Sequence, residues 1–115
     1  MKFISAALLT LSLAAPVYAA NADLYEQIWA GQAEQVITAM QQDKALVNAK
    51  LDGYTPLHLV SMNGNKEIAR FLLDNGADVN ARDFEGYSPL VRANANGNKE
   101  ISAMLIERGA KELRP

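Results

Sequence analysis

Apolar residues recur with a helical period in several short segments of the chain. Ile68, Ala69, Leu72 and Leu73 fall on one face of a helix, and the apolar residues of segment 33–40 stand at positions i, i+3, i+4 and i+7. The opposite faces carry polar residues, so each helix needs a neighbour to cover its apolar side. The pattern predicts an all-α domain of short, packed helices.

The helical pattern returns with a 33-residue period. The hexapeptide Asn63–Ile68 recurs unchanged as Asn96–Ile101, and the residues of Gly53–Leu57 recur, with one difference, as Gly86–Leu90. Several blocks held to one spacing indicate a structural period, which is typical of repeat proteins. Repeat proteins present extended surfaces to partners, so the period favours binding over catalysis.

The middle repeat, residues 50–82, has start and stop signals for two helices. Thr55 is a good N-cap, and Pro56 fits the first helical position. Gly64 ends the first helix, because a left-handed residue is needed there. Asn65 can cap the second helix, and the segment 79–81 is expected to run on as extended chain after it. The other predicted stops and starts are Gly76 here and Pro89, Gly97 and Gly109 in the third repeat, residues 83–115.

A looser copy of the unit occupies residues 21–49. Gly31 stands one full period before Gly64, whereas the distance from Val47 to its counterpart Val79 is one residue shorter than the period. The loop between Met40 and Val47 therefore holds one extra residue. This copy also lacks the Thr-Pro helix start of the middle repeat.

Residues Gly53–Val60 resemble the ankyrin-repeat signature, and Leu72–Ala81 resemble its second half. The resemblance covers the chain from residue 21 onward and implies an ankyrin-repeat solenoid of about three helix-turn-helix repeats joined by short β-turn fingers. In the third repeat Arg92 and Asn94 replace apolar or small residues. We expect such polar residues to keep the outer side of a terminal repeat soluble.

His58 is the chain's single histidine, and there is no cysteine. With Ser61 it could be drawn as part of a catalytic set, but a second histidine is missing and His58 lies one turn after Thr55. In ankyrin-like repeats this histidine bonds the turn to its own helix and to the next repeat, and Val91 shows that the position is dispensable in the third repeat. We therefore expect no catalytic residue, no metal site and no cofactor.

Apolar residues flank the turns of two predicted fingers. Leu51 and Tyr54 lie in the first finger, and Phe84 and Tyr87 occupy the equivalent places one period later. Turn chemistry favours Gly, Asn and Asp and does not require aromatic residues. An apolar row with a polar rim is what protein interfaces prefer, so we predict a partner-binding surface. The alternative is that the tyrosines only pack locally.

The exposed ends of the first helices extend this predicted surface. Met62 should lie on the concave side beside the fingers, and Trp29 stands one period before it. Tryptophan is enriched at interfaces, but it is also buried on average. Trp29 is therefore either an anchor for a partner or a cover for the N-terminal core.

The first twenty residues have the layout of a secretory signal peptide. Lys2 is followed by the apolar run 3–15, then by Pro16 and the small residues of segment 17–20. The alternative is a buried N-terminal helix. We expect a signal peptide at 1–20, a domain at 21–115 and a periplasmic or secreted location. The candidate cleavage sites follow Ala19, Ala20 or, less favourably, Ala22.

The net charge of −2 is well mixed, which argues against nucleic-acid binding. The sequence predicts a monomer that is free of the membrane after export and binds another protein. An inhibitor or immunity-type protein for an exported enzyme or toxin is the alternative. An enzyme or small-molecule binder would need a pocket at His58, and a purely structural module would pack Trp29 and the tyrosines inward.

Overall fold

The computed structural model describes the backbone of residues 17–115 and the side chains from residue 23 onward. The predicted signal peptide lies almost wholly outside the described residues, so it stays a prediction. The described helices are α2 (Val17–Trp29), α3 (Ala33–Gln42), the 3-10 helix η1 (Lys44–Asn48), α4 (Pro56–Asn63), α5 (Lys66–Asp74), α6 (Pro89–Ala95) and α7 (Lys99–Glu107).

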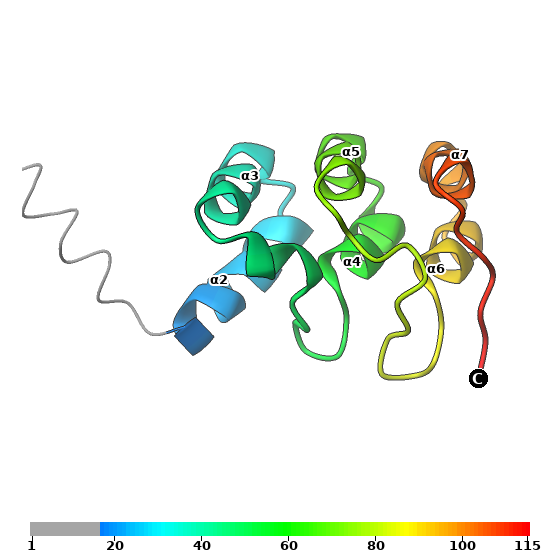
Figure 1. The fold of residues 1–115 in the computed structure, drawn as a ribbon, viewed down its shortest axis with the longest axis horizontal. Helices are drawn as coiled ribbons and strands as arrows, with labels where there is room; N and C mark the ends of the chain where they lie inside the picture. Colours follow the sequence, from blue (N-terminus) through cyan, green and yellow to red (C-terminus); the bar gives the residue numbers. More distant parts are fainter. Residues whose placement is uncertain (1–16) are drawn as a thin grey trace, which may run out of the picture.

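The helices stack as three hairpins in two rows (Figure 1). Helices α2, α4 and α6 form one row, and α3, α5 and α7 form the other. Two loops, the fingers, project beyond the first row on the side away from the second, and the chain end runs down beside the second finger. Within residues 17–115 the β-structure is limited to one antiparallel bridge between Leu51 and Tyr54. The predicted all-α repeat solenoid is therefore confirmed.

The predicted helix signals of the middle repeat are confirmed in detail. Thr55 caps α4, and its hydroxyl oxygen accepts a hydrogen bond of 3.3 Å from the His58 amide. Gly64 ends α4 in the left-handed conformation with φ of 83°. The Asn65 side chain then caps α5 by accepting a 2.9 Å hydrogen bond from the Ile68 amide. Local sequence alone accounts for this hairpin.

One local expectation is wrong. Val79 and Asn80 form a turn instead of extended chain, because the Asp78 carboxylate accepts a hydrogen bond from the Asn80 amide and the Ala81 amide bonds back to the Asp78 carbonyl. Asn98 precedes α7 but does not cap it with its side chain. Its side-chain nitrogen instead donates to the Ser61 carbonyl oxygen at 2.6 Å.

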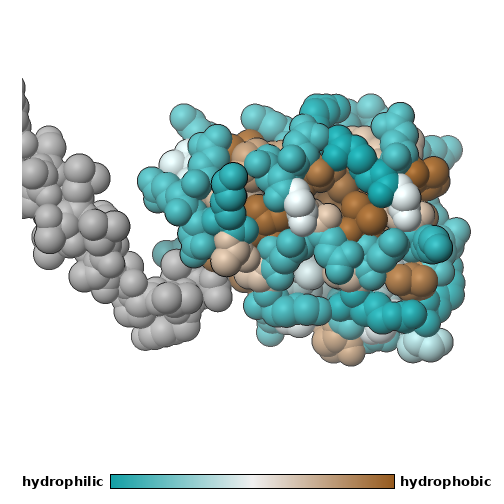
Figure 2. Space-filling view, viewed as in Figure 1, coloured by the Kyte–Doolittle hydropathy of each residue, from teal (hydrophilic) through white to brown (hydrophobic). Residues whose placement is uncertain are grey.

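Apolar side chains from both rows fill the space between them. Figure 2 shows hydrophobic residues gathered between the rows and hydrophilic residues around them. The core includes Leu57 and Leu59 of α4 and Ile68 and Leu72 of α5, all of them buried. Asparagines bond one repeat to the next outside this core. Asn48 donates to the Gly76 carbonyl oxygen and accepts from the Asp78 amide. The stacked repeats hold the two fingers side by side.

Candidate functional site

The first finger is a two-residue hairpin. The Leu51 amide donates to the Tyr54 carbonyl oxygen at 2.7 Å, and the Tyr54 amide donates back at 3.1 Å. Asp52 and Gly53 form the turn with φ of 55° and 87°. Positive φ at both central residues is the type I′ geometry, for which Asp-Gly is a favoured sequence. The turn leaves the Asp52 side chain exposed at the tip.

The second finger is one residue longer. The Asp83 amide donates to the Tyr87 carbonyl oxygen, and Gly86, at φ of 91°, donates to the Asp83 carbonyl oxygen. Asp83 therefore takes the place of Leu51 in the hairpin pairing, and Phe84 lies at the tip. The predicted equivalence of Leu51 and Phe84 is wrong, because the 33-residue offset does not hold between the fingers.

Leu51 does not belong to the exposed surface. Its side chain is 3% exposed and packs in the core, whereas Phe84 is 65% exposed. The alternation of the short hairpin turns Leu51 inward. The prediction that Leu51 lies at the finger surface is therefore wrong. Three of the four predicted finger residues are left: Tyr54, Phe84 and Tyr87.

Phe84 and Tyr54 join the two fingers. Their rings lie edge to face, with centroids 5.2 Å apart and planes at 90°, and the Phe84 amide donates to the Gly53 carbonyl oxygen at 2.9 Å. A Cβ atom at Gly53 would lie 2.9 Å from the Phe84 ring, so glycine is required here for contact as well as for φ. Direct contact fixes the spacing of the two tips.

Arg92 of α6 packs against the rings of both finger tyrosines, Tyr54 and Tyr87. Its guanidinium carbon lies 4.8 Å from the Tyr87 ring centroid and 5.6 Å from that of Tyr54. Its nitrogens bond Asp83 at 2.7 Å and Glu85 at 2.8 Å. The expectation that Arg92 simply keeps an outer surface soluble is wrong, because the side chain lies packed among finger residues.

The Asp83 carboxylate is buried beneath the second finger. Besides Arg92, it accepts hydrogen bonds from the amides of Glu85 and Tyr87. Burial acts to raise the pKa of Asp83, but these hydrogen bonds outweigh it, and the pKa lies below its usual value of 3.8. Asp83 is therefore ionised at neutral pH and holds the finger backbone.

His58 makes the contacts that the resemblance implied. The Nε2 atom lies 2.8 Å from the Tyr87 carbonyl oxygen, so it carries the proton and donates. The Nδ1 atom lies 2.7 Å from the Thr55 hydroxyl, which donates to it. Burial holds the pKa of His58 below its usual 6.5, although the Tyr87 carbonyl and Asp83 act in the opposite direction. His58 is thus a neutral, buried link between repeats.

The finger tips and α2 line an open hollow of about 550 Å³. Tyr25 of α2 is a residue that the sequence analysis missed. It stands one period before His58, so the repeat register could have identified it as the first repeat's counterpart of that histidine. Its ring also meets Trp29, with centroids 6.3 Å apart. The hollow is lined by Tyr25, Asp52, Gly53, Tyr54 and Phe84.

The remaining predicted surface residues differ in accessibility. Trp29 is 40% exposed, so it does not serve as a buried cover for the N-terminal core. Met62 and Tyr54 are half-buried and pack partly against the core. Tyr87 is also half-buried and lies against Arg92. Phe84 and Trp29 are thus the most accessible members of the predicted surface.

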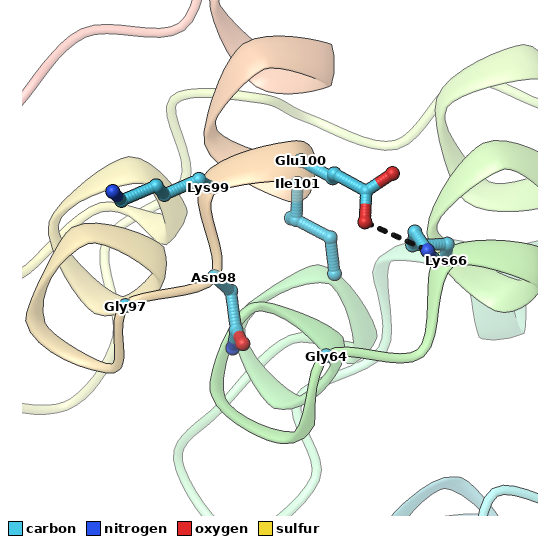
Figure 3. A pocket seen from close by; sticks show the side chains of 7 residues that line it. All are labelled: Gly64, Lys66, Gly97, Asn98, Lys99, Glu100 and Ile101. Atoms are coloured by element: carbon cyan, nitrogen blue, oxygen red, sulfur yellow. Dashed lines mark hydrogen bonds and ion pairs between the residues drawn. The ribbon is translucent and has the colours of Figure 1, made fainter.

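A second hollow, of about 280 Å³, lies at the opposite ends of the repeats, between the turn around Gly64 and the start of α7 (Figure 3). Lys66 and Glu100 meet there at 2.8 Å, and the Asn98 side chain points towards the Gly64 turn. These polar groups already bond one another or the backbone. We assign this hollow to contact between repeats.

Ser61 and His58 do not form the catalytic pair that could be drawn from the sequence. The Ser61 hydroxyl donates to the Leu57 carbonyl oxygen at 2.7 Å rather than to His58. From the described part of the chain, no group of three or more His, Cys, Asp or Glu side chains gathers where it could hold a metal ion. No helix in the same residues is long and apolar enough to cross a membrane.

The family model for ankyrin repeats in three copies matches residues 18–114. The chain belongs to the ankyrin-repeat family. Ankyrin repeats are in general a non-enzymatic scaffold that binds other proteins, which indicates that this chain is a protein–protein interaction module.

A curated relative matches part of the chain. The serine/threonine-protein kinase VIK of Arabidopsis thaliana is 44% identical over 45 residues, which cover 38% of this chain and 10% of the kinase. The match is confined to a repeat region and brings no kinase chemistry to this ankyrin-repeat chain.

Proposed function

We propose that this ankyrin-repeat protein binds its protein partner through the finger surface, defined as Trp29, Tyr54, Met62, Phe84 and Tyr87. The observation that carries the proposal is the 65% exposure of Phe84 on a finger that is otherwise firmly held. An aromatic ring that remains in water gains by burial against a partner. The contacts to Tyr54 and Gly53 fix its position beforehand, which lowers the entropy lost on binding.

We also propose that the partner is met after export. The basic Lys2, the apolar run that follows and the small residues near 17–20 support a signal peptide. An exported target enzyme or toxin would make the protein an inhibitor. Periplasmic fractionation and N-terminal sequencing of the mature chain test the location, and an N-terminus that still begins at Met1 would contradict it.

Affinity capture with matched variants tests the finger surface. The tagged full-length protein is used to capture partners from a periplasmic extract and from culture medium, and its Phe84→Ala and Trp29→Ala forms are compared with Ile106→Ala. Ile106 is a suitable control because it is an apolar side chain that is 60% exposed on α7, outside the fingers.

The proposal predicts that partners recovered with the parent and with Ile106→Ala are lost with Phe84→Ala. Retention of every partner by a folded Phe84→Ala/Trp29→Ala protein would rule out the finger surface. Loss with Ile106→Ala alone would move the interface to α7.

A further inference from the structure

We infer that the hollow between α2 and the first finger receives an arginine side chain of the protein partner. The inference rests on the proposed function and names the chemistry that the surface recognises. Three aromatic side chains and one carboxylate line the hollow: Tyr25, Tyr54, Phe84 and Asp52. Aromatic faces attract cations, and a carboxylate adds an opposite charge.

Asp52 supplies a carboxylate without an internal partner. Its side chain is exposed, and in the described part of the chain it takes part in no ion pair. The Asp-Gly turn holds it at the tip in a left-handed conformation that aspartate tolerates. The neighbouring cation, Lys50, directs its ammonium group to the Arg82 carbonyl oxygen at 2.7 Å. A partner cation would therefore meet a free negative charge.

The same finger surface already holds a guanidinium group from this chain. Arg92 lies 5.6 Å from the Tyr54 ring centroid and 4.8 Å from that of Tyr87, and it pairs with Asp83 and Glu85. Aromatic rings and carboxylates of the fingers thus already bind one arginine side chain of the protein itself. The hollow repeats this combination with Tyr54, Tyr25, Phe84 and the unpaired Asp52, but without an arginine.

The chemistry favours arginine over lysine and over a free small molecule. A guanidinium is planar, so it can stack on a ring while pairing with a carboxylate, whereas an ammonium is a strongly hydrated point charge. The hollow is open to solvent beside the fingers, so it would not enclose a free ligand. A side chain delivered by a larger partner gains the rest of its binding energy from the finger surface.

Titration of the full-length protein with a small probe tests the inference. The probe is acetyl-Gly-Arg-Gly amide, and its controls are the same peptide with citrulline or lysine in place of arginine. Binding is measured from changes in the backbone amide chemical shifts of residues 52–54 and 84. Fluorescence of Trp29, the single tryptophan, reports on the adjoining Tyr25. We expect millimolar binding of the arginine peptide with shifts confined to these amides.

The matched variants are Asp52→Asn and Glu107→Gln. Asn-Gly also favours the type I′ turn, so Asp52→Asn keeps the finger while removing the charge. Glu107 is exposed on α7 and, among the described residues, pairs with no cation. Asp52→Asn should weaken arginine-peptide binding about two- to fivefold, which is the range of an exposed ion pair, and Glu107→Gln should leave it unchanged.

Equal binding of the citrulline peptide, equal binding of the lysine peptide, or no loss with a folded Asp52→Asn protein would overturn the inference. The capture experiment tests the finger surface independently of the peptide titration. If Phe84→Ala releases a captured partner but the arginine peptide causes no shifts, the finger proposal stands and the arginine site fails.

Discussion

The imidazole Nε2 of His58 donates a 2.8 Å hydrogen bond to the Tyr87 carbonyl oxygen, which joins the first helix of the middle repeat to the finger of the next. The other ring nitrogen, Nδ1, lies 2.7 Å from the Thr55 hydroxyl and 3.3 Å from its amide. One buried side chain thus stabilises the start of α4 and the position of the second finger.

Replacing His58 by valine, the residue of the third repeat, should destabilise the protein. The Tyr87 carbonyl oxygen would lose its imidazole donor and the Thr55 amide its acceptor. The Tyr87 carbonyl oxygen keeps its bond from the Asp83 amide, so we expect the free energy of unfolding to fall by about 1–3 kcal/mol, the cost of leaving the buried Thr55 amide unpaired. Urea denaturation followed by circular dichroism measures the loss. Val91→Ala is the control, since it removes apolar contact at the corresponding position without removing a side-chain hydrogen bond.

The same histidine makes stability depend on pH. Burial lowers the pKa of folded His58 below the 6.5 that applies to the unfolded chain, so the unfolded chain binds the proton more readily. Stability is therefore full above about pH 6.5 and falls as the pH drops from there to the folded pKa, by at most about 1.4 kcal/mol per pH unit. Urea midpoints between pH 8 and pH 5 measure the effect. The same decline in His58→Val would show that other groups cause it.

The 33-residue period indicated a repeat protein, local residue types predicted both helix caps of the middle repeat, and the ankyrin resemblance implied the solenoid and the role of His58. The period failed within the fingers, because the second hairpin has one more residue than the first. A constant offset therefore aligned Leu51 with Phe84, although the hairpin hydrogen bonds, Leu51 with Tyr54 and Asp83 with Tyr87, make Asp83 the counterpart of Leu51. Counting from Val47 and Val79, which are 32 apart, would have placed Leu51 correctly.

The sequence pattern also did not predict that Arg92 is held by ion pairs with Asp83 and Glu85. The period aligns Arg92 with Leu59, and composition marks a charged residue there as a solvated one. The structure instead pairs it with Asp83, the counterpart of Leu51. The middle repeat thus has two buried leucines, Leu51 and Leu59, where the third repeat has an ion pair. Recognising that an ion pair replaces the two leucines requires the hairpin register, in which Asp83 and not Phe84 corresponds to Leu51.

A double-mutant cycle tests this exchange. Arg92→Leu should cost about 3 kcal/mol, because it leaves the buried Asp83 carboxylate without its cation. Asp83→Leu should also destabilise, through the loss of turn hydrogen bonds to Glu85 and Tyr87. The double variant recreates the leucine pair of the middle repeat, so it should lose less stability than the sum of the two single losses. Strictly additive losses in urea denaturation would argue against a coupled pair.

The chain end beside the second finger gives a further prediction. Residues 111–115 lie along that finger, where the Ser88 amide donates to the Leu113 carbonyl oxygen at 3.0 Å. The Ser88 hydroxyl donates to the Lys111 carbonyl oxygen and accepts from the Leu113 amide, so it does not cap α6. Arg82 adds a 3.0 Å hydrogen bond to the Arg114 carbonyl oxygen.

Truncation after Ala110 should therefore loosen the second finger while the helices stay folded. The Ser88 amide loses its acceptor, and the Arg82 guanidinium keeps only its bond to the Gly86 carbonyl oxygen. We expect hydrogen exchange of the Ser88 amide to rise at least tenfold, in line with about 1–1.5 kcal/mol for a lost hydrogen bond. Removal of Pro115 alone is the control, because it keeps every one of these bonds. An unchanged Ser88 exchange rate in the longer truncation would show that α6 and the finger are held without the chain end.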